Sequence, residues 1–302
     1  MTEYEEKKTK LKKQMRSYAK EKCMVAFSGG VDSSLLLKLA CEAEVAEKDT
    51  VKKTACESGS TEEDIVKNAV RGSKHVNENI YAVTMQTQLH PAREIEHAAK
   101  VAEEIGAVHF VIPVDELMEA GIDRNPQDRC YRCKKHLFTK MQEKASALGI
   151  PTILEGTNAD DLQVFRPGLK AIRELGVISP LADAGFTKAD VRRLAGEYQL
   201  SVSNRPAVPC LATRFPYGTV LSYEEMRKVE QGEEFLKSFG LYNVRLRIHH
   251  DIARIEVDSE GFPVLLQNRE TVISYMKELG YSYVTLDLEG FRSGSMDVGM
   301  KS

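Results

Sequence analysis

The feature that most constrains this chain is a glycine turn between an apolar segment and a helix-like segment near the N-terminus. The sequence SGGVDSS at positions 28–34 follows the apolar residues 24–26 and precedes the apolar run 35–40. Glycines let a backbone turn tightly and approach an anion, and the first amides of a following helix point at that anion. The pattern predicts a strand at 23–28, a phosphate-binding turn, and a helix from 31 to about 47.

The residues of this turn do not follow the Walker A phosphate-binding pattern. The spacing is not G-x-x-x-x-G-K-[ST], and no lysine stands where that pattern needs one to reach the outer phosphates of ATP. The turn instead resembles the SGGxDS motif of the PP-loop ATP pyrophosphatases, which split ATP into AMP and pyrophosphate while adenylating a substrate. An ordinary glycine-containing turn between strand and helix is the alternative interpretation.

Composition and charge are those of an ordinary globular enzyme. Of the 302 residues, 29% are charged and 42% are hydrophobic, and the formal net charge is −3. A negative charge balance does not favour nucleic acid as a partner. No apolar run approaches the ~20 residues of a membrane span, and residues 3–22 are too charged for a secretory signal. We therefore expect a cytoplasmic protein with no membrane partner.

Strand-like and helix-like segments alternate through the first two thirds of the chain. Thr187, with Asp190 three residues on, predicts the start of a helix. Such alternation is typical of an α/β fold in which helices cover both faces of a parallel sheet, with ligands at the carboxyl ends of the strands. We assign this domain to residues 1–205. Its other predicted elements are strands at 80–87, 109–114 and 152–156 and helices at 91–106 and 131–148.

The pattern changes after about residue 206 into that of a small α+β domain. A domain over residues 206–302 is near the lower size at which a chain holds its own core. Residues 48–78 are polar and are predicted to form an insertion on the surface of the first domain. The predicted elements of the second domain are helices at 223–239 and 263–279 and strands at 244–249, 253–257 and 281–288.

A second polar motif follows the strand predicted at 152–156. The sequence GTNADD at 156–161 should emerge at the same edge of the sheet as residues 28–34. Asp160 and Asp161 are candidate ligands of Mg²⁺ on the ATP phosphates, because this ion prefers one or two carboxylates together with phosphate and water oxygens. A turn rich in Asn and Asp is the alternative.

The cysteines indicate a second kind of chemistry. Cys130 and Cys133 form a C-x₂-C pair at the start of a predicted helix, and Cys210 stands at the junction of the two domains. Three thiolates suit a [4Fe–4S] cluster with one open iron, or a zinc site completed by His136. A redox pair and unbound thiols stay open as alternatives. The cysteines on other apolar segments are expected in the core, namely Cys23 and Cys41.

Taken together, these segments resemble the LarE family. The likeness extends over nearly the whole chain apart from the helical N-terminus and residues 48–78, whose roles it leaves open. The matching segments include the glycine turn, GTNADD at 156–161 and RLR at 245–247. The others are NPQDRCYRCK at 125–134, SPL at 179–181, CLATRFPYG at 210–218, ARIEV at 253–257 and LDLEGFRSGS at 286–295.

The resemblance implies an ATP-dependent sulfur transferase in the biosynthesis of the nickel-pincer nucleotide, the cofactor of lactate racemase and related enzymes. Its expected substrate is a small nucleotide, pyridinium-3,5-biscarboxylic acid mononucleotide. ATP adenylates a substrate carboxylate with loss of pyrophosphate, and a sulfur nucleophile then displaces AMP to leave a thiocarboxylate. Adenylation is needed because a carboxylate lacks a good leaving group, whereas an acyl phosphate anhydride has one.

Members of the family differ in their source of sulfur. Some sacrifice the cysteine that matches Cys210 and end with dehydroalanine there. Others hold a [4Fe–4S] cluster on three cysteines, whose open iron binds the sulfide that is transferred. This chain has Cys130, Cys133 and Cys210, so it resembles the cluster type, with sulfide or a cysteine desulfurase system as sulfur donor. Family members often assemble through the smaller domain, so a homo-oligomer is expected.

The resemblance also assigns roles to individual residues. Glu233 and Glu256 match acidic positions near the substrate phosphate and are candidate ligands of a divalent metal. Without the resemblance, Arg245 and Arg247 would be assigned to a solvated strand face and Glu233 to a solvated helix face. The residues expected at ATP and its Mg²⁺ are Ser28, Gly29, Gly30, Asp32, Ser33, Ser34, Met85, Gln86, Gly156 and Asp160. Those expected in catalysis are Asp32, Cys130, Cys133 and Cys210, and those at the substrate phosphate are Arg214, Arg245 and Arg247.

Two other functions fit parts of this pattern. A PP-loop tRNA thiolase performs the same chemistry on a different substrate, but the chain lacks a basic face interleaved with aromatic residues. A non-catalytic sensor of adenine nucleotides needs the glycine turn and would not need three thiols at a domain junction.

Overall fold

The computed structural model describes residues 2–57, 79–164 and 166–292, with residues 46–57 described by their backbone alone. They fold into two compact units. The first unit takes its residues from Met1–Gln86, Ala92–Val114 and Cys133–Ala207, and the second from Thr87–Pro91, Asp115–Arg132 and Val208–Ser302. The second unit thus includes two short segments that the sequence assigned to the first domain, because the backbone of these segments pairs with residues 211–221.

A four-stranded parallel sheet forms the centre of the first unit, as the sequence predicted. Its strands are β1 (Cys23–Ala26), β2 (Ile80–Gln86), β3 (Val108–Pro113) and β4 (Thr152–Leu154), in the order β3-β2-β1-β4. Val25 of β1 pairs with Ala82 of β2 on one side and with Leu154 of β4 on the other. The carboxyl ends of these three strands therefore meet at one edge of the sheet.

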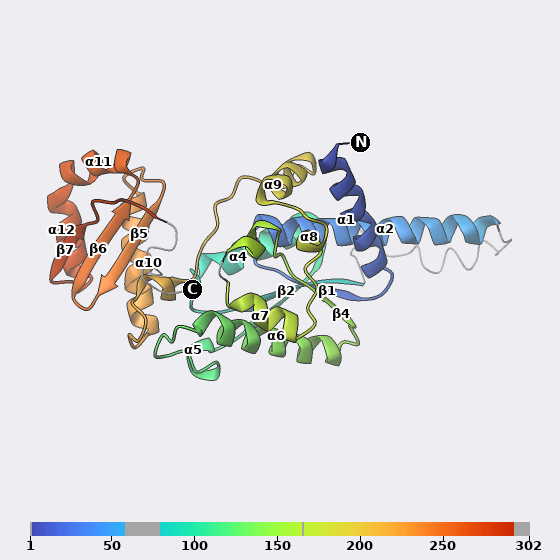
Figure 1. Cartoon of the computed structure of the whole chain (residues 1–302), viewed down its shortest axis with the longest axis horizontal. Helices are drawn as coiled ribbons and strands as arrows, with labels where there is room; N and C mark the ends of the chain where they lie inside the picture. Colours follow the sequence, from blue (N-terminus) through green and yellow to red (C-terminus); the bar gives the residue numbers. More distant parts are fainter. Residues whose placement is uncertain (1, 58–78, 165, 293–302) are drawn as a thin grey trace. The chain divides into compact units, whose positions relative to one another are not determined.

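Helices cover both faces of this sheet, which confirms the predicted fold class (Figure 1). Strand β1 is apolar on both sides, as buried parallel strands are. Its residues Cys23 and Val25 belong to one core, and Met24 packs with Phe138 and Met141 in another. The first face carries α1 (Glu3–Tyr18), α2 (Val31–Glu57), α4 (Arg93–Ile105), α8 (Pro180–Asp183) and α9 (Lys188–Glu197), and the second carries α6 (Arg129–Ala147) and α7 (Gly168–Glu174).

Helix α2 is longer than the sequence pattern predicts. The pattern places its end near residue 47, whereas the helix continues to Glu57. Residues 48–57 contain neither glycine nor proline, the residues that most strongly end a helix, so nothing in them interrupts the backbone hydrogen bonds. The rest of the predicted insertion, residues 58–78, lies outside the described residues.

The N-terminal helix α1, whose role the sequence left open, contributes to the core of the first unit. Leu11 and Met15 are buried among residues of α2 and α9. At its start, the Tyr4 hydroxyl donates to Glu197 of α9 at 2.8 Å, and Lys8 forms an ion pair with the same carboxylate. The helix is therefore part of the fold of this unit.

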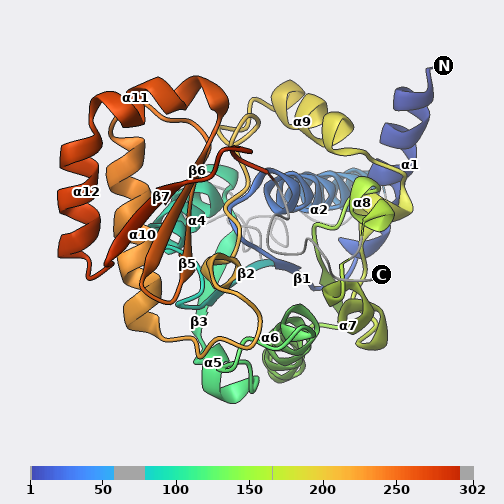
Figure 2. The ribbon, with the colours of Figure 1, turned by 60° about the vertical axis from the view of Figure 1, so that its left-hand side comes forward.

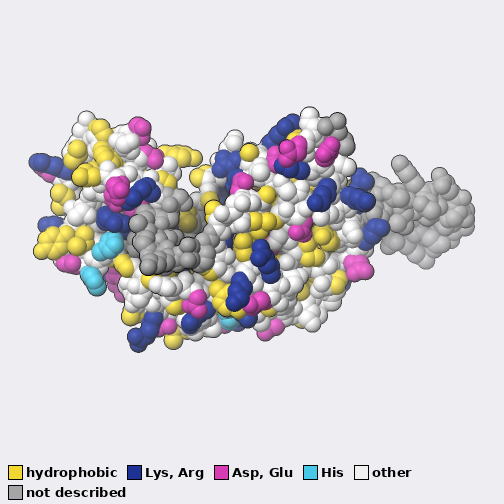
Figure 3. Space-filling view, in the orientation of Figure 1, with side chains coloured by type: hydrophobic (Ala, Val, Ile, Leu, Met, Phe, Trp, Pro, Cys, Tyr) yellow, Lys and Arg dark blue, Asp and Glu magenta, His cyan; other side chains and the backbone are white. Residues whose placement is uncertain are grey.

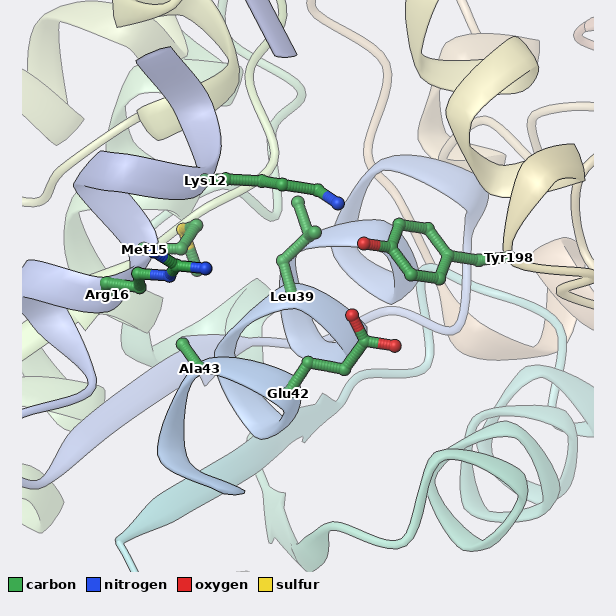
Figure 4. A pocket seen from close by; sticks show the side chains of 7 residues that line it. All are labelled: Lys12, Met15, Arg16, Leu39, Glu42, Ala43 and Tyr198. Atoms are coloured by element: carbon green, nitrogen blue, oxygen red, sulfur yellow. The ribbon is translucent and has the colours of Figure 1, made fainter. Parts of the chain in front are cut away.

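A pocket of about 160 Å³ lies between α1, α2 and α9 (Figure 4). The Lys12 ammonium lies 5.4 Å from the centre of the Tyr198 ring across it. Its lining residues are Lys12, Met15, Arg16, Leu39, Glu42, Ala43 and Tyr198, none of which belongs to the glycine turn or the GTNADD loop. This pocket is therefore separate from both motifs.

Replacement of Leu11 by Ala is expected to lower the free energy of unfolding by about 2–5 kcal/mol, because it leaves a cavity in a packed core. Leu11 has no exposed surface. Urea unfolding followed by circular dichroism measures the change, and the exposed neighbour Lys13→Ala is the control, expected within about 0.5 kcal/mol of wild type. A change as small as that of the control would contradict the placement of α1 in the core.

The second unit contains a three-stranded sheet in the order β5-β6-β7. β5 (Val244–His249) runs antiparallel to β6 (Ile252–Val257), and β7 (Tyr283–Leu286) runs parallel to β6. Helices α10 (Tyr223–Lys237), α11 (Phe262–Gln267) and α12 (Arg269–Glu278) lie beside the sheet (Figure 2). The unit also contains α5 (Glu116–Glu119) and the 3₁₀ turns η2 (Leu211–Arg214) and η3 (Ser259–Gly261).

The single helix predicted at 263–279 is wrong, because α11 and α12 are separate. The backbone of Asn268 between them has φ −102° and ψ 16°, which lies outside the helical region. Its side-chain Nδ2 donates to the carbonyl oxygen of Val264 at 2.8 Å. Asparagine competes in this way with helical hydrogen bonds, and it marks the break.

On the face shown in Figure 3, the basic and acidic side chains of the described residues are interspersed. Within the described part of the chain, every helix is too short or too polar to span a bilayer.

Candidate functional site

The glycine turn between β1 and α2 has the backbone geometry that the sequence predicts. Gly29 has a φ of +68°, in the left-handed region that favours glycine. A Cβ at this position would lie 2.9 Å from the Cα of Ala98, so α4 packs directly on the turn. The Nε2 atom of His97 lies 3.2 Å from the Gly29 carbonyl oxygen. Glycine is needed here for its left-handed backbone conformation and for the close packing of α4. The sequence indicates only the first of these reasons.

Serine hydroxyls and helix amides converge on this turn. The Ser28 amide donates to the Ser33 hydroxyl at 3.3 Å, and that hydroxyl donates to the Gly30 carbonyl oxygen at 3.2 Å. The Ser34 amide also donates to Gly30, at 3.0 Å. The amides before it, at the start of α2, have no carbonyl one turn back and are available to an anion. The buried Ser34 hydroxyl has no hydrogen-bond partner among the described residues.

The GTNADD loop lies against the glycine turn, as predicted for loops that follow neighbouring parallel strands. A Cβ at Gly156 would lie 3.1 Å from the amide nitrogen of Ser33, so glycine keeps that amide open. The Asn158 Nδ2 donates to the Asp32 carboxylate at 3.1 Å. The two sequence motifs therefore form one site at the carboxyl edge of the sheet.

Lys188 completes this cluster, and sequence reasoning missed it. Its ammonium forms an ion pair with Asp32, and its backbone amide donates to Asp160 at 2.8 Å. Lys188 is the first residue of α9, and the capping box of Thr187 and Asp190 before it is present as predicted. The predicted cap is the sequence signal that could have identified Lys188. It places the first residue of α9, which is this lysine, near the carboxyl edge of the sheet.

The candidate magnesium ligands have protein partners in this structure. Asp161 forms an ion pair with Arg166 at 2.9 Å and accepts the Asn158 amide at 3.1 Å. The exposed Asp160 accepts the amide of Lys188. Asp160 is therefore the carboxylate of the pair that faces solvent beside the glycine turn.

A buried glutamate that the sequence did not single out organises the same loop. Glu155 follows β4 and accepts both the amide and the hydroxyl of Thr157, at 3.0 Å and 2.9 Å. The Ser179 hydroxyl also donates to Glu155, which ties the SPL segment to the loop. An acidic residue at a strand end could have drawn notice, but its burial is visible only in the fold.

Met85 and Gln86 end β2 at the same edge of the sheet. Met85 is half-buried and Gln86 is exposed. The Thr84 hydroxyl just before them donates to the Phe27 carbonyl oxygen at 2.8 Å, which ties this strand end to the start of the glycine turn. Their position is compatible with the predicted adenosine side of the site.

In the second unit, Cys210 begins a turn that is held on several sides. The Thr213 hydroxyl donates to the Cys210 carbonyl oxygen at 2.7 Å. The next amide, that of Leu211, donates to the Leu89 carbonyl oxygen at 2.8 Å. The Arg129 guanidinium lies 3.5 Å from the Ala212 carbonyl oxygen. We call residues 210–214 the Cys210 turn.

The three cysteines assigned to sulfur chemistry differ in exposure. Cys130 is exposed, and Cys133 and Cys210 are half-buried. Burial raises the pKa of the Cys210 thiol, while the charge of Arg129 and the amide of Ala212 oppose this shift. Among the residues that the structure describes, no group of three or more His, Cys, Asp or Glu side chains is arranged as a metal site.

Cys23 and Cys41 lie in the core, as predicted. Both are buried, and burial raises the pKa of each thiol to about 12. They are therefore poor nucleophiles at neutral pH. Cys56 lies outside the described side chains.

Arg214 is buried and bound to protein groups on every side. It forms a bidentate pair with Glu233 of α10, at 2.8 Å and 2.9 Å. Its Nη1 donates to the carbonyl oxygens of Pro209 and Cys210, at 3.2 Å and 3.1 Å. Burial alone would raise the pKa of Glu233, but the hydrogen bonds and charge of Arg214 lower it overall. The solvated helix face considered for Glu233 is therefore wrong.

Arg247 is buried in a second ion pair. Its Nε donates to Glu256 at 3.1 Å, and Arg254 donates to the other oxygen of that carboxylate at 3.0 Å. The Nη1 of Arg247 donates to the Thr213 carbonyl oxygen at 2.7 Å. Arg247 is 4% exposed, so the solvated strand face considered for it is also wrong. Arg214 and Arg247 thus both hold the Cys210 turn.

Arg245 differs from these two arginines. It is half-buried, it lies 5.1 Å from the Phe291 ring, and its guanidinium donates to the Val244 carbonyl oxygen at 2.7 Å. No carboxylate in the described part of the chain forms an ion pair with it. Burial, followed by the nearby charge of Arg214, lowers the pKa of Arg245 to about 10. A bound anion would offset both effects.

Comparison with known proteins decides the family. The chain is 35% identical over 277 residues to pyridinium-3,5-bisthiocarboxylic acid mononucleotide synthase from Lactiplantibacillus plantarum, which covers 92% of this chain and 89% of that protein. The chain belongs to the LarE family. An uncharacterised protein from Synechocystis is 32% identical over 279 residues, 92% of each chain, and one from Methanocaldococcus jannaschii is 28% identical over 285 residues, 94% and 96% of the two chains.

A second comparison concerns the N-terminal half of this LarE-family chain. The family model described as NAD synthase matches residues 3–145, a stretch that contains the glycine turn. The match agrees with the PP-loop resemblance of the turn and with the parallel sheet that carries it. The chain is therefore an ATP-dependent enzyme of the PP-loop class.

Proposed function

We propose that this chain is an ATP-dependent sulfur transferase that converts a carboxylate of pyridinium-3,5-biscarboxylic acid mononucleotide into a thiocarboxylate. A bisthiocarboxylic acid mononucleotide appears in the name of its relative from L. plantarum. The observation that carries the ATP half of the proposal is the cluster of Asp32, Asn158 and Lys188, which joins separate segments at the glycine turn.

The proposed reaction has two steps. In the first, a carboxylate oxygen of the substrate attacks the α-phosphorus of ATP, and the bond to the bridging oxygen breaks to release pyrophosphate. In the second, an anionic sulfur attacks the carbonyl carbon of the acyl adenylate, and AMP leaves with the electron pair of the broken C–O bond. Both steps depend on fixed donors that stabilise charge on phosphate oxygens.

The chain supplies such donors at the glycine turn. The open amides at the start of α2 and the buried Ser34 hydroxyl are fixed before any ligand binds. Lys188 adds a positive charge that Asp32 holds beside the turn. Asp160 is the candidate magnesium ligand, since its carboxylate is exposed there. Together these groups would bind and orient the phosphates of ATP.

The first test is the nature of the phosphate product. Wild type with substrate is expected to release AMP and pyrophosphate, measured by ion-exchange chromatography. Asp32→Asn and Lys188→Met are expected to lower this rate about 10- to 100-fold, because each removes a charged contact of about 1.5–3 kcal/mol. The control is Lys7→Met, since Lys7 pairs with Asp190 on the same helix as Lys188 but away from the turn. Release of ADP and orthophosphate would contradict the proposal.

Arg245 is the arginine best placed to bind the substrate phosphate. Arg214 and Arg247 already pair with Glu233 and Glu256, whereas Arg245 has no carboxylate partner among the described residues. These two glutamates are likewise engaged by arginines, so a metal there would have to displace an ion pair. We therefore assign phosphate binding to Arg245 and support of the Cys210 turn to the other two arginines.

Arg245→Ala is expected to raise the KM for the nucleotide substrate about 10- to 100-fold and to leave the KM for ATP unchanged, because a charge-assisted contact contributes about 1.5–3 kcal/mol. Arg247→Ala should instead lower the free energy of unfolding by about 3–5 kcal/mol, because it leaves Glu256 buried and unpaired. Steady-state kinetics and urea unfolding measure the two effects, and exposed Arg269→Ala is the control. Equal changes in both KM values for Arg245→Ala would assign it a structural role.

For the sulfur source, we propose that Cys130, Cys133 and Cys210 hold a [4Fe–4S] cluster. The donor chemistry suits such a cluster, because three cysteine thiolates can ligate it and the C-x₂-C pair lies on one turn of α6. When bound, such a cluster would supply sulfide for the transfer and leave the cysteines intact. The hydrogen bonds around the Cys210 turn would then fix the position of one of its three thiolates.

A further inference from the structure

Arg129 is a buried cation with no role in the reaction steps proposed above for ATP and sulfur. It is 4% exposed, and it lies 5.5 Å from the Tyr217 ring. Its hydrogen bonds go to neutral groups, the side-chain oxygen of Asn125 and the carbonyl oxygen of Ala212. Across the described residues, no carboxylate forms an ion pair with it.

The other two buried arginines of the second unit differ from Arg129, because each forms an ion pair with a glutamate. Arg214 pairs with Glu233, and Arg247 pairs with Glu256. A buried charge without a partner of opposite sign carries a large desolvation cost. Such a charge at an active site is understandable when the missing anion arrives with the substrate.

The guanidinium of Arg129 has donors to spare for such an anion. Both of its hydrogen bonds are made by Nη1. Among the described residues, neither Nε nor Nη2 has a hydrogen-bond partner. These two groups form the edge of the guanidinium that matches a carboxylate in a bidentate pair.

The position of Arg129 indicates which anion this is. It lies beside the Cys210 turn, with its guanidinium 3.5 Å from the carbonyl oxygen of Ala212, two residues after Cys210. It is also the first residue of α6, a helix of 19 residues whose positive end favours an anion. Sulfur transfer requires the carboxylate carbon of the substrate to come close to the sulfur held there.

We propose that Arg129 binds a carboxylate of the pyridinium nucleotide and holds it beside Cys210. This inference rests on the proposed function and names the group that recognises the reacting end of its substrate. Arg245 would bind the phosphate at the other end. Two arginines with no carboxylate partner among the described residues would thus match the two kinds of anion on the substrate.

The test compares two mononucleotides that differ only at the carboxylate. Nicotinic acid mononucleotide carries a carboxylate on its pyridinium ring, and nicotinamide mononucleotide carries a neutral amide in the same place. Isothermal titration of each into anaerobically purified wild type is expected to show at least about tenfold tighter binding of the acid, the effect of one charge-assisted pair. In Arg129→Met this ratio should fall to about one, while the affinity for the amide stays unchanged.

Two further variants complete the test. Arg132→Met, one turn on in the same helix and exposed in its pair with Asp128, should keep the wild-type ratio. Arg129→Lys keeps the charge but loses the bidentate geometry, so an intermediate ratio is expected. Thermal melting checks folding, and if Arg129→Met does not fold, the wild-type and Arg129→Lys ratios decide.

The outcomes separate this inference from the proposed function. Equal affinity of wild type for the two nucleotides, or a ratio that survives in Arg129→Met, would overturn the role of Arg129 and leave sulfur transfer standing. If neither nucleotide bound wild type at millimolar concentration, the pyridinium nucleotide itself would be the wrong substrate class, and both proposals would fall.

Discussion

Gly29→Ala is expected to abolish the release of pyrophosphate from ATP, with a loss of at least about 100-fold in kcat/KM, because misplacing a reacting group by about 1 Å has an effect of this size. The added Cβ would lie 2.9 Å from the Cα of Ala98, a backbone atom that cannot move without shifting α4. The φ of +68° adds the strain of a left-handed conformation. Pyrophosphate release and the affinity for ATP are the measurements.

Two control variants separate the effect of the contact with Ala98 from the effect of the left-handed backbone. Gly149→Ala has a φ of +63° with no atom within 4 Å of the new Cβ, so it tests the backbone strain alone and should leave activity unchanged. Gly30→Ala has no positive φ, and its Cβ would meet only the Ser28 hydroxyl, at 3.3 Å, so a smaller loss is expected. Wild-type activity in Gly29→Ala would mean that the phosphates bind elsewhere.

The first unit could be predicted from sequence because its signals are local. The apolar residues of β1, the two glycines and the helix start stand next to one another in the chain, and the cap of α9 lies within four residues. Polar composition alone predicts a loop after residue 47, whereas helix α2 continues to Glu57. Composition is a weaker signal than the absence of glycine and proline.

The role of Lys188 could not be predicted, because its contact with Asp32 is not local in the sequence. Its partner Asp32 is 156 residues away, and no local pattern connects a lysine at a helix start with an acid after another strand. The connection exists because parallel strands bring their carboxyl ends to one edge of the sheet. Contacts of this kind follow from the topology and cannot be read from either segment alone.

The arginines of β5 show where a strand pattern is ambiguous. In sequence, the alternation of Arg245 and Arg247 favours a solvated strand face, and only the resemblance to the LarE family favours a ligand site. In the sheet, Arg245 stands opposite Glu256, yet the ion pair is made by Arg247. The choice between these two neighbours depends on side-chain packing against the Cys210 turn, which no periodicity encodes.

The second large effect is expected at the cysteines, where changing Cys130, Cys133 or Cys210 to Ala should remove most of the brown colour and bound iron. A cluster that already lacks a fourth protein ligand is poorly retained by two thiolates. Each variant should also lose sulfur transfer while ATP binding stays nearly intact, because none of the three cysteines belongs to the glycine turn or to the GTNADD loop. The matched control is Cys41→Ala, since Cys41 is buried in the core of that unit and should keep colour and activity. Visible absorbance and iron content of anaerobically purified protein are the measurements.

The alternative source of sulfur, sacrifice of Cys210 itself, predicts a different pattern from the same variants. Only Cys210→Ala would then lose activity, and wild type would make one thiocarboxylate per chain. Its mass would fall by that of H₂S, about 34 Da, at Cys210, and added sulfide would not restore it, since simple thiol chemistry does not reverse this loss. Mass spectrometry after anaerobic turnover decides between the two. Intact Cys210 with several products per chain supports the cluster, whereas dehydroalanine at Cys210 would show that the cysteine itself is consumed and that Cys130 and Cys133 serve another purpose.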